Sequence, residues 1–115
     1  RSYASIAKKC SVGSGVELKN CVVMENTQIG RLSFIGDSVL GENVDMGAGC
    51  MTVNRNIDWK PISVKNGKGS INTGLKKLGA FLGDGVVVGA GNTLQPGTVI
   101  APGKTIPACY SVKQK

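Results

Sequence analysis

A six-residue rhythm of apolar side chains is the feature that most constrains the fold of this chain. A period of six is neither the roughly 3.6-residue period of a helix nor the plain alternation of a strand, and a fixed repeat of this kind predicts a repeat architecture. Its members recur at steps of six, and twice of five, and they are Ile6, Val12, Leu18, Met24, Ile29, Ile35, Leu40, Met46 and Thr52, then Leu82, Val88, Leu94, Ile100, Ile106 and Val112.

Each hexad is expected to supply one short strand and one turn, so that three hexads complete one coil of a prism. Successive coils then stack about 4.8 Å apart through backbone hydrogen bonds. The aliphatic residue and the small residue four positions later both point inward in this arrangement, and the small residues are Cys10, Val16, Val22, Cys50, Val86 and Thr98. The sequence predicts an all-β fold, a parallel β-helix of about five coils, as a single domain over residues 1–115. A β-sandwich with glycine turns is the alternative, but it would not keep this register on both sides of an interruption.

Glycines accompany the rhythm along the whole chain and provide the backbone conformations that tight turns require. They are Gly30, Gly36, Gly41 and Gly47 before the interruption, and Gly85, Gly91, Gly97 and Gly103 after it.

The rhythm stops after Asn54 and resumes at Leu82. The interruption, about residues 55–78, contains two strand-like runs around Asn66-Gly67, a pair typical of a hairpin turn. We therefore expect a hairpin-like arm that projects from the prism and is free to reach a neighbouring subunit.

Positive charge is concentrated in this arm. The whole chain has a formal charge of +7, and the segment 54–78 alone has six cations against Asp58, a net of +5. Such an excess is compatible with nucleic acid, a membrane surface or a phosphate-bearing ligand. No aromatic residues alternate with the cations as single-strand stacking would need, so nucleic-acid binding is not favoured. A solvated basic loop and a phosphate site both remain open.

Other classes of function are disfavoured by composition. The chain has no histidine, and its four cysteines form no CxxC pair, so a metal site is not expected and Cys10 and Cys50 are interpreted as reduced core residues. No apolar run approaches the roughly 20 residues that span a membrane, and no signal peptide opens the chain. We expect a cytoplasmic protein, and because the chain begins without Met, the C-terminal part of a longer one.

The hexads resemble the hexapeptide-repeat, left-handed β-helix acyltransferases. More narrowly, the stretches Gly30-Arg-Leu-Ser-Phe-Ile-Gly-Asp and Gly47-Ala-Gly-Cys-Met-Thr-Val-Asn54 resemble the C-terminal domain of the bifunctional enzymes that make UDP-N-acetylglucosamine. The run Lys76-Lys-Leu-Gly-Ala-Phe-Leu-Gly83 is similar to the archaeal sugar-1-phosphate nucleotidyltransferase branch. The resemblance implies an N-terminal nucleotidyltransferase domain in the full protein. It also implies a homotrimer whose clefts between prisms hold acetyl-CoA and an amino-sugar phosphate.

The same resemblance assigns roles to individual residues. Lys19 and Lys60 match lysines directed toward the sugar phosphate, which suits their point charges. Ala48 and Asn54 match residues beside acetyl-CoA, and Lys76 and Lys77 are assigned to the same ligand.

Three positions depart from the family. Arg31 stands where the family has its catalytic histidine, Phe34 where it has a tyrosine, and Asp45 where it usually has an asparagine. Acetyl transfer to an amine needs a group that accepts a proton, and a guanidinium stays protonated. General-base catalysis contributes on the order of 10²–10⁴-fold, so acetyltransferase activity is expected to be impaired. A salt bridge between Arg31 and Asp45 would replace the catalytic pair if the two side chains face each other.

Two functions follow from these residues. The first is a trimer-forming, acyltransferase-like domain of a sugar-phosphate nucleotidyltransferase, with impaired acetyl transfer. The alternative is an active acetyl-CoA-dependent N-acetyltransferase, in which water or Asp45 takes the proton; an adjacent Arg31 would weaken Asp45 as a base.

Overall fold

The computed structural model describes residues 4–66, 69–108 and 111–112, and every regular element in them is a β-strand. The strands are β1 (Ala4–Ile6), β2 (Ser11–Val12), β3 (Glu17–Lys19), β4 (Cys21–Val23), β5 (Gln28–Ile29), β6 (Phe34–Gly36), β7 (Val39–Leu40), β8 (Asp45–Met46), β9 (Met51–Thr52), β10 (Ser63–Asn66), β11 (Gly69–Asn72), β12 (Phe81–Leu82), β13 (Val87–Val88), β14 (Thr93–Leu94), β15 (Val99–Ile100), β16 (Thr105–Ile106) and β17 (Ser111–Val112). None of the described residues forms a helix long and apolar enough to cross a membrane.

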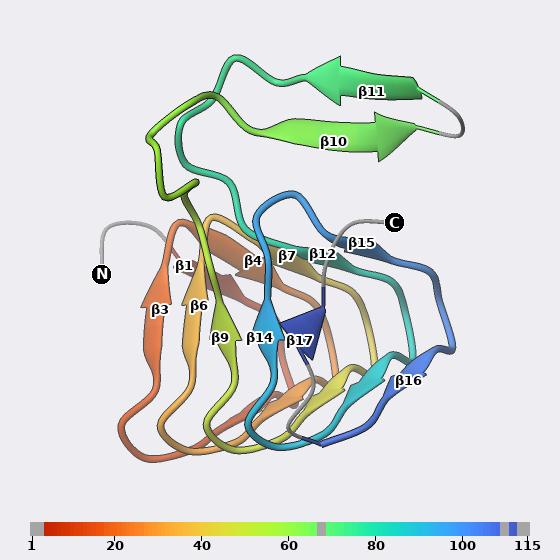
Figure 1. Cartoon of the computed structure of the whole chain (residues 1–115). Coiled ribbons are helices and arrows are strands. Elements are labelled where there is room, and N and C mark those ends of the chain that lie inside the picture. The colour runs from red at the N-terminus through yellow and green to blue at the C-terminus, as the bar shows by residue number, and fades with distance from the viewer. Residues whose placement is uncertain (1–3, 67–68, 109–110, 113–115) are drawn as a thin grey trace.

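Three parallel five-stranded sheets form the walls of a prism (Figure 1). Sheet A contains β1, β4, β7, β12 and β15; sheet B contains β2, β5, β8, β13 and β16; sheet C contains β3, β6, β9, β14 and β17. The chain visits the sheets in the order A, B, C, so three strands make one coil and five strands per sheet make five coils. The predicted all-β, left-handed parallel β-helix is confirmed.

Strand register fixes the length of each coil. Val22 stacks on Val39, 17 residues later, whereas Phe81 stacks on Val99, 18 residues later. The 17-residue coils have one residue fewer than the 18-residue coils at the corner where the chain passes from sheet C to sheet A. The inward residue after Leu18 is therefore Val23, five positions on, and the prediction that Val22 and Met24 point inward is wrong: they are 41% and 39% exposed, whereas Val23 is 1% exposed.

Inward side chains form a narrow core of aliphatic residues, with Ile35, Leu40 and Leu94 fully buried. The second inward position of each hexad is smaller and often polar, and Cys50, Val86 and Thr98 lie there as predicted. Its polar members satisfy backbone carbonyls at the corners, as when the Thr27 hydroxyl donates to Gly41 O at 2.8 Å. Among the described residues, no buried side-chain nitrogen or oxygen lacks a hydrogen-bond partner.

The glycines serve two different purposes. Gly85, Gly91, Gly97 and Gly103 have positive φ at corners, as predicted. Gly30 and Gly47 do not; a Cβ on Gly30 would lie 2.5 Å from Ala48 N in the next coil. The turn interpretation is therefore wrong for these glycines, which permit close stacking of coils instead. In the shorter coils, residues such as Asn26, Asp37 and Asn43 adopt the positive φ.

The arm leaves the prism after β9 and returns before β12, at the corner between sheets C and A (Figure 1). Its strands β10 and β11 pair antiparallel, which confirms the hairpin, whereas Gly67 of the predicted turn lies outside the described residues. Ile62 is 1% exposed and anchors the base of the arm: its N–H donates to Leu75 O at 2.8 Å, and its carbonyl accepts from the Thr73 hydroxyl at 2.6 Å. The returning chain attaches to the corner, where Gly79 N donates to Asp37 O at 2.7 Å.

Candidate functional site

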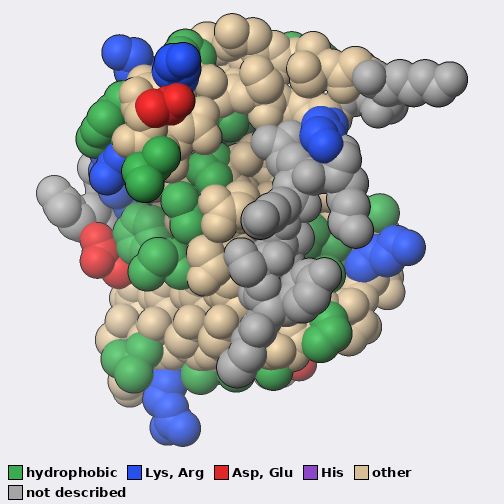
Figure 2. All heavy atoms as spheres, viewed as in Figure 1, with side chains coloured by type: hydrophobic (Ala, Val, Ile, Leu, Met, Phe, Trp, Pro, Cys, Tyr) green, Lys and Arg blue, Asp and Glu red, His purple; other side chains and the backbone are tan. Residues whose placement is uncertain are grey.

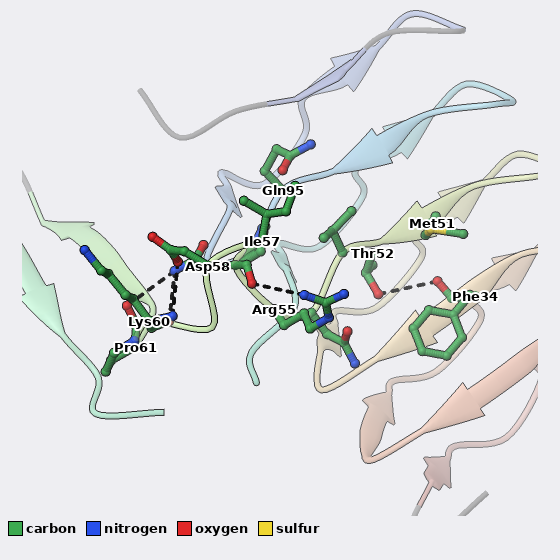
Figure 3. Close-up of a pocket in the computed structure, with 13 residues that line it drawn as sticks. Phe34, Met51, Thr52, Arg55, Ile57, Asp58, Lys60, Pro61 and Gln95 are labelled. Carbon is green, nitrogen blue, oxygen red and sulfur yellow. Dashed lines mark hydrogen bonds between the residues drawn. The ribbon is translucent and has the colours of Figure 1, made fainter. Parts of the chain in front are cut away.

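A groove of about 900 Å³ lies between the first part of the arm and the outer face of sheet C. It brings together three residues assigned from the sequence, namely Phe34, Asn54 and Lys60. Figure 3 shows Phe34 and Met51 at one end, Lys60 and Pro61 at the other, and Arg55 between them. The face seen in Figure 2 has apolar side chains gathered on its left and Lys and Arg side chains around its edges. An apolar floor with cations above it suits a ligand that combines a phosphate with a less polar part.

Local hydrogen bonds hold the first part of the arm in a compact loop. The Asp58 carboxylate accepts from Lys60 N at 3.1 Å, and the Asn56 amide donates to Lys60 O at 3.1 Å. The Arg55 guanidinium lies 4.2 Å from the centre of the Trp59 ring, within the range of a cation–π interaction. Trp59 itself has a φ of 61°, a conformation that is rare for a bulky residue. These contacts fix the place of Lys60 at the rim of the groove.

Asn54 has a structural role besides its assigned one. Its side-chain amide donates to Asp37 Oδ2 at 2.9 Å, and Asp37 Oδ1 accepts from the Asn20 amide at 3.5 Å. The three side chains form a ladder on the corner between sheets C and A. The backbone carbonyl of Asn54 also accepts a hydrogen bond from Leu78 N at 2.8 Å, so Asn54 joins the two ends of the arm.

Arg31 and Ala48 lie at a different corner, between sheets B and C. A shallow pocket of about 360 Å³ is lined there by Gly13, Ser14, Gly30, Arg31 and Ala48. Turn hydrogen bonds from one coil to the next place Ser14, Arg31 and Ala48 in one column. Arg31 is therefore a long, exposed side chain between two small ones.

Asp45 is on β8 and points outward from sheet B, where it pairs with Gln28. Arg31 follows β5 and stacks in the turn next to Ala48, at the corner between sheets B and C. The structure contains no ion pair between Arg31 and Asp45, and the proposed salt bridge is not formed.

The assigned lysines are also dispersed. Lys19 ends β3 and stacks on Gly36, while Lys76 and Lys77 are exposed on the returning part of the arm. One protomer therefore presents the assigned residues at several places, namely the groove, the column of small residues, sheet B and the end of the arm.

Sequence reasoning did not single out Arg55, Ile57, Gln95 and Pro96, all of which line the groove. Gln95 and Pro96 are in the coil after the arm, and only the stacking of coil four on coil three brings them there. The basic composition of the arm was the one signal that pointed to Arg55.

Ionisable side chains give little sign of metal chemistry. Over residues 4–66, 69–108 and 111–112 there is no group of three or more His, Cys, Asp or Glu placed to hold a metal ion. Burial raises the pKa of the Cys21 and Cys50 thiols, with nearby backbone hydrogen bonds acting in the opposite direction. These two thiols are core groups rather than nucleophiles at the surface.

A prism of stacked hexads, with an arm inserted between sheets C and A, is a left-handed parallel β-helix of the hexapeptide-repeat class. The family described as GMPPB C-terminal domain matches residues 2–115, and the chain belongs to that family. The resemblance to bifunctional sugar-phosphate enzymes is confirmed by the relatives described next.

Two of the relatives are bifunctional enzymes by name. A bifunctional sugar-1-phosphate nucleotidylyltransferase/acetyltransferase of Sulfurisphaera tokodaii is 43% identical over 101 residues, 87% of this chain and 25% of its own length. The bifunctional protein GlmU of Methanocaldococcus jannaschii is 36% identical over 100 residues, 87% of this chain and 24% of its own length. The chain thus spans about a quarter of the length of each of these two curated relatives.

Solved structures share the fold at low sequence identity. AntD, an N-acyltransferase from Bacillus cereus solved with dTDP and 3-hydroxybutyryl-CoA, gives a TM-score of 0.52 at 17% identity over 97% of this chain and 67% of that chain. A hexapeptide transferase family protein from Anaplasma phagocytophilum gives a TM-score of 0.52 at 14% identity, covering 97% and 68%. These two similarities show the fold alone.

Proposed function

We propose that this chain is the C-terminal β-helix domain of a longer sugar-phosphate nucleotidyltransferase, that it assembles as a homotrimer, and that its acetyltransferase chemistry is impaired. The impairment is inferred from one observation: Arg31, beside Ala48, and Phe34, on the floor of the groove, stand at the two positions where the resemblance to the bifunctional enzymes implies histidine and tyrosine. Family membership and the named activities of the relatives support the rest.

Proton transfer is the step that these replacements remove. An amine that attacks a thioester must lose a proton, and a guanidinium cannot take it. The ring of Phe34 has no hydroxyl with which to orient an amine or a water molecule. General-base catalysis is worth on the order of 10²–10⁴-fold in rate, so binding can persist while turnover falls by about that factor.

Binding is supported by the charges that remain. Lys60 and Arg55 stand over an apolar floor in the groove, which fits a phosphate-bearing sugar. We propose that Lys19 belongs to the same phosphate site, and that Ala48, Asn54, Lys76 and Lys77 serve acetyl-CoA. Because these residues are dispersed over one protomer, a complete cleft needs a neighbouring copy. We further propose that the protein acts in the cytoplasm.

A thiol-release assay with acetyl-CoA and a panel of amino-sugar phosphates tests the proposal. The protein is expected to release almost no thiol, and the double variant Arg31→His/Phe34→Tyr is expected to gain measurable turnover. Arg31→Ala/Phe34→Ala is the matched control, because it removes both side chains without supplying a base. Clear turnover by the unchanged chain would refute the impairment.

The alternative is an active N-acetyltransferase that uses Asp45 or water as the base. The exposure of Asp45, without an ion pair to Arg31, favours this alternative. It predicts thiol release by the unchanged chain, and loss of that activity in Asp45→Asn if Asp45 is the base.

A further inference from the structure

The loop that opens the arm, residues 54–61, holds an arginine by its face and by one edge. The Arg55 guanidinium lies 4.2 Å from the centre of the Trp59 ring, and Arg55 Nη1 donates to Asn56 O at 3.3 Å. Asn56 O also accepts from Trp59 N at 3.0 Å. One carbonyl oxygen therefore connects the guanidinium with the backbone of its aromatic partner. We call residues 54–61 the entry loop.

The entry loop is also held by hydrogen bonds of its own. The Asn56 amide donates to Lys60 O at 3.1 Å and to Pro61 O at 3.4 Å. The Asp58 carboxylate accepts from Lys60 N at 3.1 Å. Trp59 has a φ of 61°, which is rare for a bulky residue, and strained conformations of this kind cluster at binding sites. The backbone of the loop thus fixes the place of the Trp59 ring independently of its contact with Arg55.

Most of the hydrogen-bonding capacity of Arg55 remains available. A guanidinium has five N–H donors in a planar fork, and within the described ranges Arg55 donates only to Asn56 O. Asp58 is the only acidic residue among those that line the groove, and its carboxylate is turned to Lys60 N. No ion pair joins Asp58 to Arg55 in the part of the chain that the structure describes.

Arg55 is placed where an anion in the groove can reach it. It lines the groove together with Lys60, and Figure 3 shows it between Lys60 and the apolar end at Phe34. Stacking on an aromatic ring uses the face of a guanidinium and leaves free the edge that carries the N–H donors. A planar edge with several donors matches two oxygens of a phosphate group.

We propose that Arg55 binds a phosphate group in the groove through two N–H donors, and that Trp59 is the positioning residue that holds the guanidinium in place. This inference rests on the phosphate-bearing ligand proposed above, and it adds two residues to which the family resemblance assigns no role. Lys60 supplies a second positive charge in the same groove. A phosphate monoester has a charge of about −1.5 to −2 at neutral pH, so two cations favour it over a singly charged carboxylate.

The fluorescence of Trp59 tests the contact directly, because Trp59 is the only tryptophan of the chain. Inorganic phosphate is the probe, added at constant ionic strength, and acetate is the singly charged comparison. Phosphate is expected to change the emission of Trp59 in a saturable way, because it binds the cation that lies against the ring. Acetate is expected to bind at least about tenfold more weakly, because it has one charge and one fewer oxygen.

Variants of Arg55 test which residue holds the phosphate. Arg55→Gln is expected to weaken phosphate binding, measured by calorimetry, at least about tenfold, because charge-assisted hydrogen bonds are lost. Arg55→Lys keeps the charge but not the planar fork, so it should recover only part of the affinity. Lys104→Gln is the matched control: it removes one positive charge at an exposed position between β15 and β16, and it should bind phosphate like the unchanged chain.

A double-mutant cycle tests the positioning role of Trp59. Trp59→Leu is expected to weaken phosphate binding in the unchanged chain but to have little further effect in Arg55→Gln, because Trp59 acts through the guanidinium. Trp59→Phe should recover most of the affinity, since a phenyl ring also attracts a cation. Equal losses from Trp59→Leu in both backgrounds would show that Trp59 only shapes the loop, and would overturn its positioning role. Circular dichroism and thermal melting establish that the variants are folded.

Failure of this inference and failure of the proposed function are distinguishable. If Arg55→Gln binds phosphate as tightly as the unchanged chain, the phosphate lies elsewhere, and this inference is wrong while the proposed function stands. If acetate binds as tightly as phosphate, the assignment of the groove to phosphate is overturned. If the unchanged chain binds no phosphate, both this inference and the proposed phosphate-bearing ligand are wrong, whereas the impairment of acetyl transfer is still decided by thiol release.

Discussion

Gly30 has an ordinary backbone conformation, yet the packing of coils leaves no room for a side chain there. A Cβ at this position would lie 2.5 Å from Ala48 N and 2.7 Å from Ala48 Cα, both backbone atoms that cannot move away without separating the coils. Gly85 is the opposite case, with a φ of +72° and open space around the same point.

We therefore expect Gly30→Ala to lower the free energy of unfolding by about 2–3 kcal/mol, the upper part of the range for overpacked sites. Gly85→Asn is expected to be nearly neutral, because Asn43 and Asn26 hold the positive φ at the same corner in earlier coils. Urea unfolding measures both. If the two variants lost the same free energy of unfolding, the need for glycine at position 30 would come from backbone conformation and not from close stacking of the coils.

Cys21 and Cys50 lie in the core, and burial raises the pKa of both thiols. We expect them to resist iodoacetamide at pH 8 in the native chain and to react once urea unfolds it, as peptide mass spectrometry can establish for each cysteine. The thiolate is the reactive form, so both the raised pKa and the lack of access slow the reaction. Rapid native alkylation of Cys50 would contradict its placement in the core.

The same raised pKa has a defined effect on stability. As the pH rises past about 8.5, the unfolded chain loses these protons before the folded chain does. The stabilisation is thus complete below that pH and is lost as the pH approaches the folded pKa. Urea unfolding across this window, with a Cys21→Ala/Cys50→Ala variant as control, should show a smaller decline in the variant.

The six-residue period predicted most of the inward aliphatic residues. Each inward residue stacks on the corresponding residue of the next coil, so inward residues recur at regular intervals in the sequence. The period failed at Val22 and Met24. A 17-residue coil has one residue fewer between Leu18 and Val23, and the pattern of apolar residues did not show at which turn that residue was missing. The candidate site was harder to predict. The groove depends on how the loop of Arg55 and Trp59 folds back, and a Trp with positive φ has no sequence signature.

At the scale of elements, the arm and the prism are separate packing units. Ile62 is buried at the base of the arm but lies outside the cluster of residues that forms the prism core. The hairpin could be predicted from its Asn-Gly pair and flanking strands. The anchoring role of Ile62 could not, because it depends on Thr73 and Leu75 returning to the same place.

Ile62→Ala should therefore loosen the arm without unfolding the prism. Truncation of a buried isoleucine costs about 2–5 kcal/mol, and here that loss should fall on the arm alone. Hydrogen exchange is expected to accelerate at the amides of residues 62–75, while the prism strands keep their protection. Ile71→Ala, with the same change at an exposed position of the arm, is the control. Faster exchange throughout both units would show that the arm and the prism unfold together.

At the scale of the molecule, the coils on either side of the arm already stack directly. β7 pairs with β12, β8 with β13 and β9 with β14, although the paired residues are 42 positions apart in sequence. The prism core is therefore continuous across the arm.

Replacing residues 53–80 by Gln-Pro-Gly-Thr, the connection that joins β14 to β15 as residues 95–98, should leave a folded five-coil prism. Its melting temperature is expected to lie within about 5 °C of the full chain, because the removed contacts lie mainly in the arm and its attachment. It should no longer bind phosphate-bearing ligands in the groove, which calorimetry can measure. A chain that fails to fold would show that the attachment at Asp37 and Asn54 is required for the prism.

The corner between sheets C and A is the place where coil length varies. The single residue that separates a 17-residue coil from an 18-residue coil is missing there, and the whole arm is inserted there. The strands on either side stay in register despite these changes, since β4 still stacks on β7 and β7 on β12. Evolution can lengthen or replace the loop at this position while the repeats stay in frame, and a protein engineer could graft a foreign peptide at the same point.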